Sequence, residues 1–263
     1  MTQNAEGFYE ELADYYHLIY EDWDRSIQRQ AGVLNGLLAS QLGNGPLNIL
    51  DCSCGIGTQS IGLAQLGHHV VASDMSQAAV NRAENEARQR NLRIQFHVSD
   101  MTSLKEIEQD GFDAAIAIDN SLPHVDRSQL GQAAAAIRSK LRPNGIFIAS
   151  IRDYDALLIE RPTSQPPAFW GKPGNRRIVH QIWDWNDGTN SEPGYTDPSY
   201  RLHLYITIES AQGWKAHHFV SRYGWLLREE LSSVLRDAGF NEIRWLMPAE
   251  SGFFQPLVLA RLT

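Results

Sequence analysis

Five strand-like runs alternate with helix-like segments between residues 46 and 151, and this alternation limits the chain to few folds. The runs cover residues 47–51, 69–74, 94–100, 112–119 and 146–151. When a helix joins one strand to the next, the crossover is right-handed, the strands are parallel and helices cover both faces of the sheet. The spacing therefore predicts an α/β fold, in which ligands bind at the carboxyl ends of the strands.

Residues 152–223 interrupt the alternation and predict an inserted antiparallel sheet. Prolines break their first part, and three β-like runs follow over residues 177–185, 200–209 and 214–223. In the second run, Leu202, Leu204 and Ile206 alternate with polar side chains, which indicates one buried and one polar face.

The segments on either side of this insertion are predicted to complete the main domain. A helix over 226–238 ends at Gly239, a frequent helix stop. Two terminal strands, over 240–247 and 255–262, are joined by a short loop and should pair as a hairpin. At the other end of the chain, residues 26–42 predict an amphipathic helix that follows a run of aromatic residues.

The charge balance and the cysteine content exclude several classes of protein. The 263 residues carry 31 acidic and 23 basic side chains, a formal net charge of −8, which argues against binding along nucleic-acid phosphates. No run reaches the roughly 18 apolar residues of a membrane span, and the N-terminus has no signal-peptide pattern. Cys52 and Cys54 are the only cysteines, so we expect a reducing, cytoplasmic setting. Their spacing does not match a zinc site, and no metal is expected.

The loop after the first predicted strand, Asp51-Cys-Ser-Cys-Gly-Ile-Gly57, has the composition of a nucleotide-binding turn. Glycines let the backbone approach a ligand, and the following helix offers free N–H groups. Ser60 departs from the dinucleotide pattern, which requires Gly or Ala at that position. Asp74, at the end of the next strand, would accept the two ribose hydroxyls. Without a ligand, the same loop would be an ordinary strand-to-helix turn.

These residues resemble the class I S-adenosylmethionine-dependent methyltransferases. Residues 49–58 are similar to the first motif of that family, Asp74 to its ribose acid, residues 98–101 to its adenine-binding segment and residues 143–145 to a further signature. Ser53 stands where the first of the usual three glycines lies. The resemblance implies a seven-stranded Rossmann-like sheet whose last strand is antiparallel, with helices on both faces. It also implies S-adenosylmethionine as cofactor and S-adenosylhomocysteine as product.

The resemblance also assigns regions and cofactor contacts. Residues 1–45 would form a helical cap over the cofactor, residues 46–151 and 224–263 the cofactor-binding domain, and residues 152–223 an inserted substrate-binding lid. The aromatic N-terminus and the segments 119–124 and 151–154 look most like small-molecule N-methyltransferases of the glycine and sarcosine type. The cofactor-binding residues that follow, with Arg29 near the cofactor carboxylate, are Tyr20, Trp23, Arg29, Asp51, Ser53, Gly55, Gly57, Asp74, Met75, Asp100, Met101, Asp119 and Asn120.

Three polar residues are candidates for catalysis. His124 follows the fourth strand and is interpreted as a general base or as a hydrogen-bond partner of the methyl acceptor. Alternatively, it has no role in the reaction and simply stands at the start of a helix. Asp119 precedes it in the same segment. Asp153 follows the fifth strand and could reach the acceptor, or form a surface pair with Arg152.

The insertion is rich in tryptophan, which favours an aromatic pocket for a flat acceptor, although these rings could only pack the insertion onto the main domain. The predicted acceptor-binding residues are Tyr16, His124, Tyr154, Trp183, Trp185, Tyr205 and Trp214. The resulting hypothesis is methyl transfer to a nitrogen of a planar heterocycle, such as an azapteridine intermediate of a natural product. Alternatives are a glycine- or sarcosine-type amino acid acceptor, small-molecule O-methylation, and a catalytically silent cofactor-binding subunit. The oligomeric state stays open.

Overall fold

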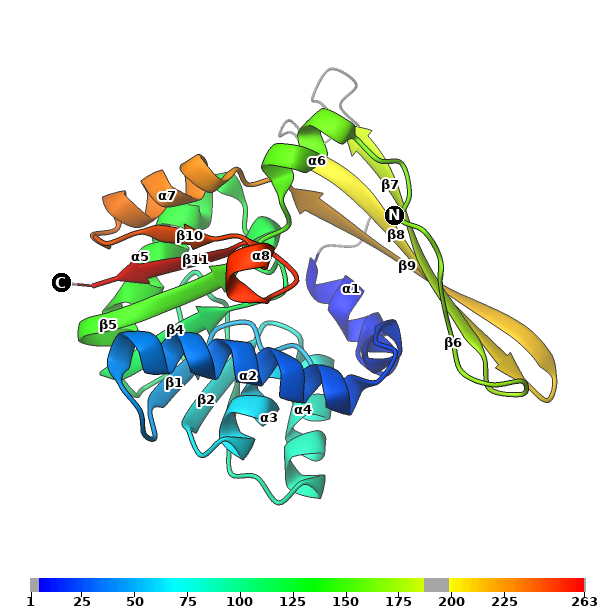
Figure 1. Ribbon diagram of the computed structural model, residues 1–263, viewed down its shortest axis with the longest axis horizontal. Helices are drawn as coiled ribbons and strands as arrows, with labels where there is room; N and C mark the ends of the chain where they lie inside the picture. The colour runs from blue at the N-terminus through cyan, green and yellow to red at the C-terminus, as the bar shows by residue number, and fades with distance from the viewer. Residues whose placement is uncertain (1–4, 187–198, 263) are drawn as a thin grey trace.

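The computed structural model describes residues 5–186 and 199–262, which form a seven-stranded sheet and a separate four-stranded sheet (Figure 1). The larger sheet has the order β10-β11-β5-β4-β1-β2-β3, and β11 is antiparallel to both of its neighbours. Its strands are β1 (Asn48–Asp51), β2 (His69–Asp74), β3 (Gln95–Val98), β4 (Phe112–Ala117), β5 (Leu141–Ser150), β10 (Arg244–Leu246) and β11 (Leu257–Arg261). The predicted Rossmann-like sheet with an antiparallel last strand is confirmed.

Helices cover both faces of this sheet because the central strands are apolar on both sides. Along β1, Ile49 belongs to a core with α2 (Trp23–Leu42) and α3 (Thr58–Gln65), whereas Leu50 belongs to the core on the opposite face. That second core includes residues of α5 (Leu130–Lys140) and α7 (Arg228–Asp237). α4 (Gln77–Gln89) begins after Ser76, whose side chain accepts a hydrogen bond from the Ala79 N–H, as the sequence predicts.

Two stretches of the sheet differ from the sequence-based expectation. The fifth strand was expected over residues 146–151, but β5 already begins at Leu141 and runs through the signature residues 143–145. Asn144 has a φ of 60° and the pairing register with β4 shifts at Phe112, so this stretch is an irregular strand start in which turn residues are tolerated. The predicted C-terminal hairpin is confirmed, with shorter strands and with α8 (Pro248–Ser251) between them.

The four-stranded antiparallel sheet has the order β6-β7-β8-β9 and extends away from the main domain (Figure 1). Its strands are β6 (Ala168–Trp170), β7 (Arg177–Asn186), β8 (Ser199–Ser210) and β9 (Gly213–Gly224). On β8, Leu202, Leu204 and Ile206 are buried, as their alternation predicts. Both β6 and α6 (Tyr154–Glu160) lie in the proline-rich part, where no element was expected. Residues 187–198 of the predicted lid lie outside the described residues, and the predicted region boundaries stay predictions.

The start of the N-terminal region lies between the two sheets, whereas α2 runs across one face of the larger sheet (Figure 1). The region consists of α1 (Ala5–Leu12), the 3-10 helix η1 (Tyr16–Ile19) and α2, which begins three residues earlier than predicted because Asp22 caps its first turn. α1 packs against both β9 and α4. Two further 3-10 helices, η2 (Leu122–His124) and η3 (Arg127–Gln129), follow β4. None of the helices in the described part of the chain is long and apolar enough to cross a membrane.

Candidate active site

A cavity of about 440 Å³ opens at the carboxyl ends of β1, β2 and β4, where the sequence places the nucleotide site. It is lined by eight of the predicted cofactor-binding residues, namely Tyr20, Ser53, Gly55, Asp74, Met75, Asp100, Met101 and Asp119. The remaining five of that set, Trp23, Arg29, Asp51, Gly57 and Asn120, do not line it. We call this space the cofactor cavity.

Asp74 fixes the glycine loop at the floor of the cofactor cavity. Its two carboxylate oxygens accept hydrogen bonds from the backbone N–H of Gly55 at 2.8 Å and of Ser76 at 3.0 Å. Gly55 has a φ of 51° and Gly57 a φ of 92°, and at Gly57 a Cβ would come within 3.0 Å of Ile61. The loop therefore needs glycine at these positions, and its Gly55 N–H holds the carboxylate of Asp74 at the cavity lining.

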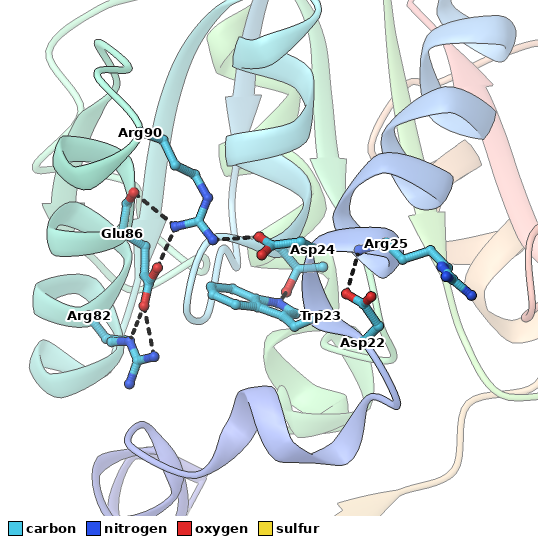
Figure 2. A network of polar contacts seen from close by, with 8 residues as sticks. Asp22, Trp23, Asp24, Arg25, Arg82, Glu86 and Arg90 are labelled. Atoms are coloured by element: carbon cyan, nitrogen blue, oxygen red, sulfur yellow. Dashed lines mark hydrogen bonds and ion pairs between the residues drawn. The ribbon is translucent and has the colours of Figure 1, made fainter. Parts of the chain in front are cut away.

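Asp51 and Trp23 support this loop from behind. Asp51 is buried, accepts a hydrogen bond from Ser60 Oγ at 2.6 Å, and has its pKa raised to about 7 by burial. The indole N–H of Trp23 donates to Thr58 Oγ1 at 2.9 Å, and the Arg90 guanidinium lies 5.3 Å from the centroid of its ring (Figure 2). Both residues were predicted to contact the cofactor, but here they position the elements that surround it.

Arg29 was expected near the cofactor carboxylate, but its side chain is exposed. The buried positions of α2 recur at helical spacing through Trp23, Ile27 and Gln30, which leaves residue 29 on the outer surface. Gln30 and Gln59 are the buried polar residues at this end of the site, and the sequence did not single them out.

Asp119 stands on the wall between the cofactor cavity and a second cavity. Its Oδ2 accepts hydrogen bonds from Tyr16 at 3.0 Å and Tyr20 at 3.3 Å, while its backbone N–H donates to Ser150 Oγ at 2.7 Å. Its φ is 61°, an uncommon backbone conformation for an aspartate that persists because these contacts fix it. Burial, the largest influence, raises the pKa of the Asp119 carboxyl above its ordinary value.

His124 lines the cofactor cavity and not the second cavity, although the sequence predicted it as an acceptor-binding residue. Its Nε2 is 3.1 Å from the Tyr9 hydroxyl, and its ring lies 4.0 Å from the ring of Tyr223. Nδ1 is buried and has no hydrogen-bond partner among the described residues. Burial and the nearby Arg152 lower the pKa of His124 to about 3, so the imidazole is neutral near pH 7. It is therefore a weak base that is well suited to hydrogen bonding.

The second cavity, of about 490 Å³, lies between the N-terminal region, the end of β5 and the four-stranded sheet. It shares Tyr9, Tyr16, Tyr20 and Asp119 with the cofactor cavity. Its polar lining includes Arg152 and the amides of Asn120, Gln165, Gln181 and Gln255, and its apolar lining comes from α1 and β8. We call this space the acceptor cavity.

Arg152 occupies the aromatic side of the acceptor cavity. Its guanidinium carbon lies 4.7 Å from the ring centroid of Trp183 and 5.3 Å from that of Tyr223, and it donates to the Tyr200 hydroxyl at 2.7 Å. Its backbone N–H donates to Asn120 Oδ1. The amide nitrogen of Asn120, Nδ2, is buried and has no partner among the described residues. Arg152 was not predicted as a site residue, although it lies in the segment on which the family resemblance rests.

Comparison with known proteins finds similarity over the glycine loop and the strands that follow it. The family description "Methyltransferase domain" matches residues 49–145. A glycine/sarcosine N-methyltransferase from Parasynechococcus marenigrum (strain WH8102) is 31% identical over 138 residues, which are 52% of this chain and 48% of that protein. A glycine N-methyltransferase from Mus musculus is 30% identical over 172 residues, 59% and 57% of the two chains. The chain thus spans about half the length of the curated relatives that it matches.

The solved structures agree on the fold. A S-adenosylmethionine-dependent methyltransferase from Clostridium acetobutylicum ATCC 824 superposes with a TM-score of 0.75 over 95% of this chain and 98% of that chain, at 16% identity. The chain contains a class I S-adenosylmethionine-dependent methyltransferase domain. The family predicted from the glycine loop, Asp74 and the adenine segment is thereby confirmed.

The cofactor cavity of this methyltransferase domain has the donors and acceptors that S-adenosylmethionine requires. Asp74 lines the cavity beside the glycine loop and is available for ribose hydroxyls, and Asp100 and Met101 form the wall after β3. Tyr20 and Asp119 line the cavity at the end where the strand order places the amino acid part of the cofactor. These residues fit the cofactor, while their individual roles stay predictions.

Four predicted catalytic or acceptor residues have other partners. Asp153 lines the acceptor cavity, but it caps α6 and pairs with Arg228 at 2.6 Å, and Arg152 turns inward instead of pairing with it. Trp185 donates to the Pro162 carbonyl. Tyr205 and Trp214 lie on the opposite face of the four-stranded sheet, where Tyr205 stacks on two histidines and Trp214 is 47% exposed. Tyr16 and Trp183 do line the acceptor cavity, with Tyr154 buried behind Asn120.

Proposed function

We propose that this protein transfers the methyl group of S-adenosylmethionine to a nitrogen of a small planar heterocycle bound in the acceptor cavity. The observation that carries the proposal is the size and lining of that cavity, which meets the cofactor cavity at Asp119. Pockets of about 300–1,000 Å³ hold drug-sized ligands with a few polar groups that fix orientation. Glycine would leave most of this space to water.

The amides of the acceptor cavity match the edge of a heterocycle. Gln165 offers both a donor and an acceptor, whereas the amide oxygens of Gln181 and Asn120 already accept hydrogen bonds and leave their N–H₂ groups as donors. The unpaired Nδ2 of Asn120 is one donor free for a ring nitrogen or carbonyl. Aromatic and aliphatic side chains supply the faces, although Trp183 contributes mainly by supporting Arg152. This arrangement differs from the stacking on several tryptophans that the sequence suggested.

The residues of the shared wall would do the proton and alignment chemistry. When bound, the cofactor supplies an electrophilic methyl group on a sulfonium. The tyrosines hold the Asp119 carboxylate in place, and that carboxylate accepts the proton of the acceptor N–H. His124 lines the cofactor cavity and fixes the shared residue Tyr9 through a hydrogen bond, and the surrounding aromatic rings exclude water. Asp153, fixed by Arg228, serves to begin α6 rather than to move a proton.

A second candidate is an amino acid acceptor, favoured by Arg152. A guanidinium held at the wall of the cavity can bind a carboxylate, and the curated relatives are glycine and sarcosine N-methyltransferases. The hydrogen bonds of Arg152 to Tyr200 and Gln181 already use part of its donor set, which leaves fewer N–H groups for a bidentate contact.

A cytoplasmic location also stays a proposal.

The test is a panel of acceptors with isotope-labelled S-adenosylmethionine. Fused-ring nitrogen heterocycles should be methylated, with labelled methyl on nitrogen, and should compete with one another. Methylation of glycine or sarcosine alone would favour the second candidate, and methylation of phenols alone an O-methyltransferase. Tight S-adenosylhomocysteine binding with no turnover of any acceptor would indicate a catalytically silent subunit.

A further inference from the structure

The strand order fixes the direction in which the cofactor lies. Asp100 and Met101 follow β3, Asp74 ends β2, the glycine loop follows β1, and Asp119 follows β4. With the adenine at β3 and the ribose at Asp74, the amino acid end points towards β1 and β4. Tyr20 and the first turn of α3 close the cavity there.

The lining of this end carries no lysine or arginine within the described residues. Arg29 is exposed on the far side of α2. The cavity lining does include Arg127 and Arg222, but they come from η3 and β9, where Arg127 pairs with Glu230 and Arg222 donates to Ser199. The carboxylate of a zwitterionic amino acid end must therefore be held by neutral donors.

A buried chain of neutral polar side chains ends at this position. Gln30 Nε2 donates to Ser26 Oγ at 3.0 Å, and Gln59 Nε2 donates to Gln30 Oε1 at 2.7 Å. Ser26, Gln30 and Gln59 are 8%, 1% and 4% exposed, and Gln59 lines the cofactor cavity. Gln59 donates one N–H of its amide to Gln30, and its Oε1 accepts no hydrogen bond from any residue that the structure describes, so this oxygen is left for a ligand.

The direction of this chain selects the group that Gln59 recognises. An amide oxygen accepts hydrogen bonds, so it suits an ammonium group and not a carboxylate. The carboxylate finds donors nearby in the Tyr20 hydroxyl and the free amides of the first turn of α3. The observation that carries the inference is a buried side chain at the cavity lining whose amide oxygen has no partner among the described residues.

We propose that Gln59, oriented by Gln30 and Ser26, binds the ammonium group of the cofactor's amino acid end through Oε1. This inference rests on the cofactor class and is independent of the proposed acceptor. The predicted contact between Arg29 and the cofactor carboxylate has no place in this arrangement, because Arg29 is exposed.

Calorimetry with three ligands tests the proposal without turnover. The ligands are S-adenosylhomocysteine, its analogue without the amino group, and 5′-deoxy-5′-methylthioadenosine, which lacks the whole amino acid end. The wild-type protein should prefer S-adenosylhomocysteine to the desamino analogue. Gln59→Ala should reduce that preference about tenfold, the effect of one hydrogen bond to a charged group. Affinity for methylthioadenosine should stay within about twofold, well under the tenfold that 1.4 kcal/mol represents.

Matched variants separate recognition from support of the fold. Gln28→Ala, on the exposed face of α2, should change nothing, and Gln30→Met should reduce the preference by a smaller factor than Gln59→Ala. Gln59→Met preserves side-chain length and serves if the alanine variant is unstable. An unchanged preference in a folded Gln59 variant overturns the proposal, as does an equal loss of affinity for all three ligands, which would mean that Gln59 only supports the loop.

Discussion

The cofactor cavity and the acceptor cavity meet at Asp119, yet they are built in opposite ways. The cofactor cavity is formed largely by consecutive strand-loop-helix units, so Gly55, Asp74 and Asp100 each follow a strand of one sheet. The acceptor cavity gathers residues from α1, the end of β5, the four-stranded sheet and the C-terminal hairpin. A ligand site made by local units can be read from motifs, whereas one assembled from distant segments depends on how those segments pack.

The largest effect is expected at the wall that both cavities share. Asp119→Asn keeps the size of the side chain but removes its basicity, and should lower kcat by about 10²–10⁴-fold if the carboxylate accepts the acceptor proton. Because burial raises the pKa of Asp119, the wild-type rate should begin to fall at a higher pH than for an ordinary carboxyl as the solution is acidified. Single-turnover rates across pH measure this.

The control for that variant is cofactor binding. S-adenosylhomocysteine affinity of Asp119→Asn should be nearly unchanged, because the tyrosine hydroxyls can still donate to the amide oxygen. A variant with full kcat and weakened cofactor binding would indicate that Asp119 serves the cofactor cavity alone.

Asp74→Ala should break the cofactor side of the comparison. Hydrogen bonds to a charged group contribute about 1.5–3 kcal/mol each, so the loss of two ribose contacts should weaken S-adenosylhomocysteine binding by tenfold or more. Asp113→Ala, at the opposite end of the sheet, is the control. Unchanged affinity in the folded Asp74 variant would rule out the ribose assignment.

Arg152→Gln should break the acceptor side. Removing the guanidinium should raise the acceptor KM by about tenfold, the range for one hydrogen bond to a charged group, and leave cofactor affinity intact. Trp214→Ala, at the exposed start of β9, should leave the acceptor KM unchanged. A KM that rises in Trp214→Ala and not in Arg152→Gln would contradict the placement of the acceptor.

The smallest effect is expected at His124. Its pKa of about 3 makes it neutral throughout the usual assay range, so His124→Gln should lower kcat/KM by roughly threefold to tenfold, as for one neutral hydrogen bond of about 0.5–1.5 kcal/mol. The pH profile should show no inflection near 6.5 that disappears in the variant. A loss of 10²-fold or more would restore the general-base role that the sequence left open.

The same contrast explains which residues the sequence could identify. Ser76, Asp74 and the loop glycines act within a few residues of themselves, so their spacing predicts their contacts. Trp23 was predicted as a cofactor contact from the family resemblance, but its helical position turns it towards Thr58 and Arg90. The prediction could not foresee that orientation, since it depends on where α2 packs.

The acceptor side was harder to predict for the same physical reason. Arg152 contacts the rings of Trp183 and Tyr223, which are distant in sequence and which the four-stranded sheet brings next to it. Trp214 has the same residue type as Trp183, but the strand alternation places it on the other face of the sheet. Composition therefore overstated the number of tryptophans at the site. The alternation of apolar and polar residues, in contrast, correctly indicated an antiparallel sheet.

A crystal structure with S-adenosylhomocysteine bound is the most direct test of the two-cavity account. The account predicts the adenine against Asp100 and Met101, the ribose hydroxyls on Asp74, the amino group on Gln59, and the sulfur facing Asp119, with the acceptor cavity open beyond it. Density for the ligand in the space between Arg152 and Gln181 instead would contradict the assignment of both cavities.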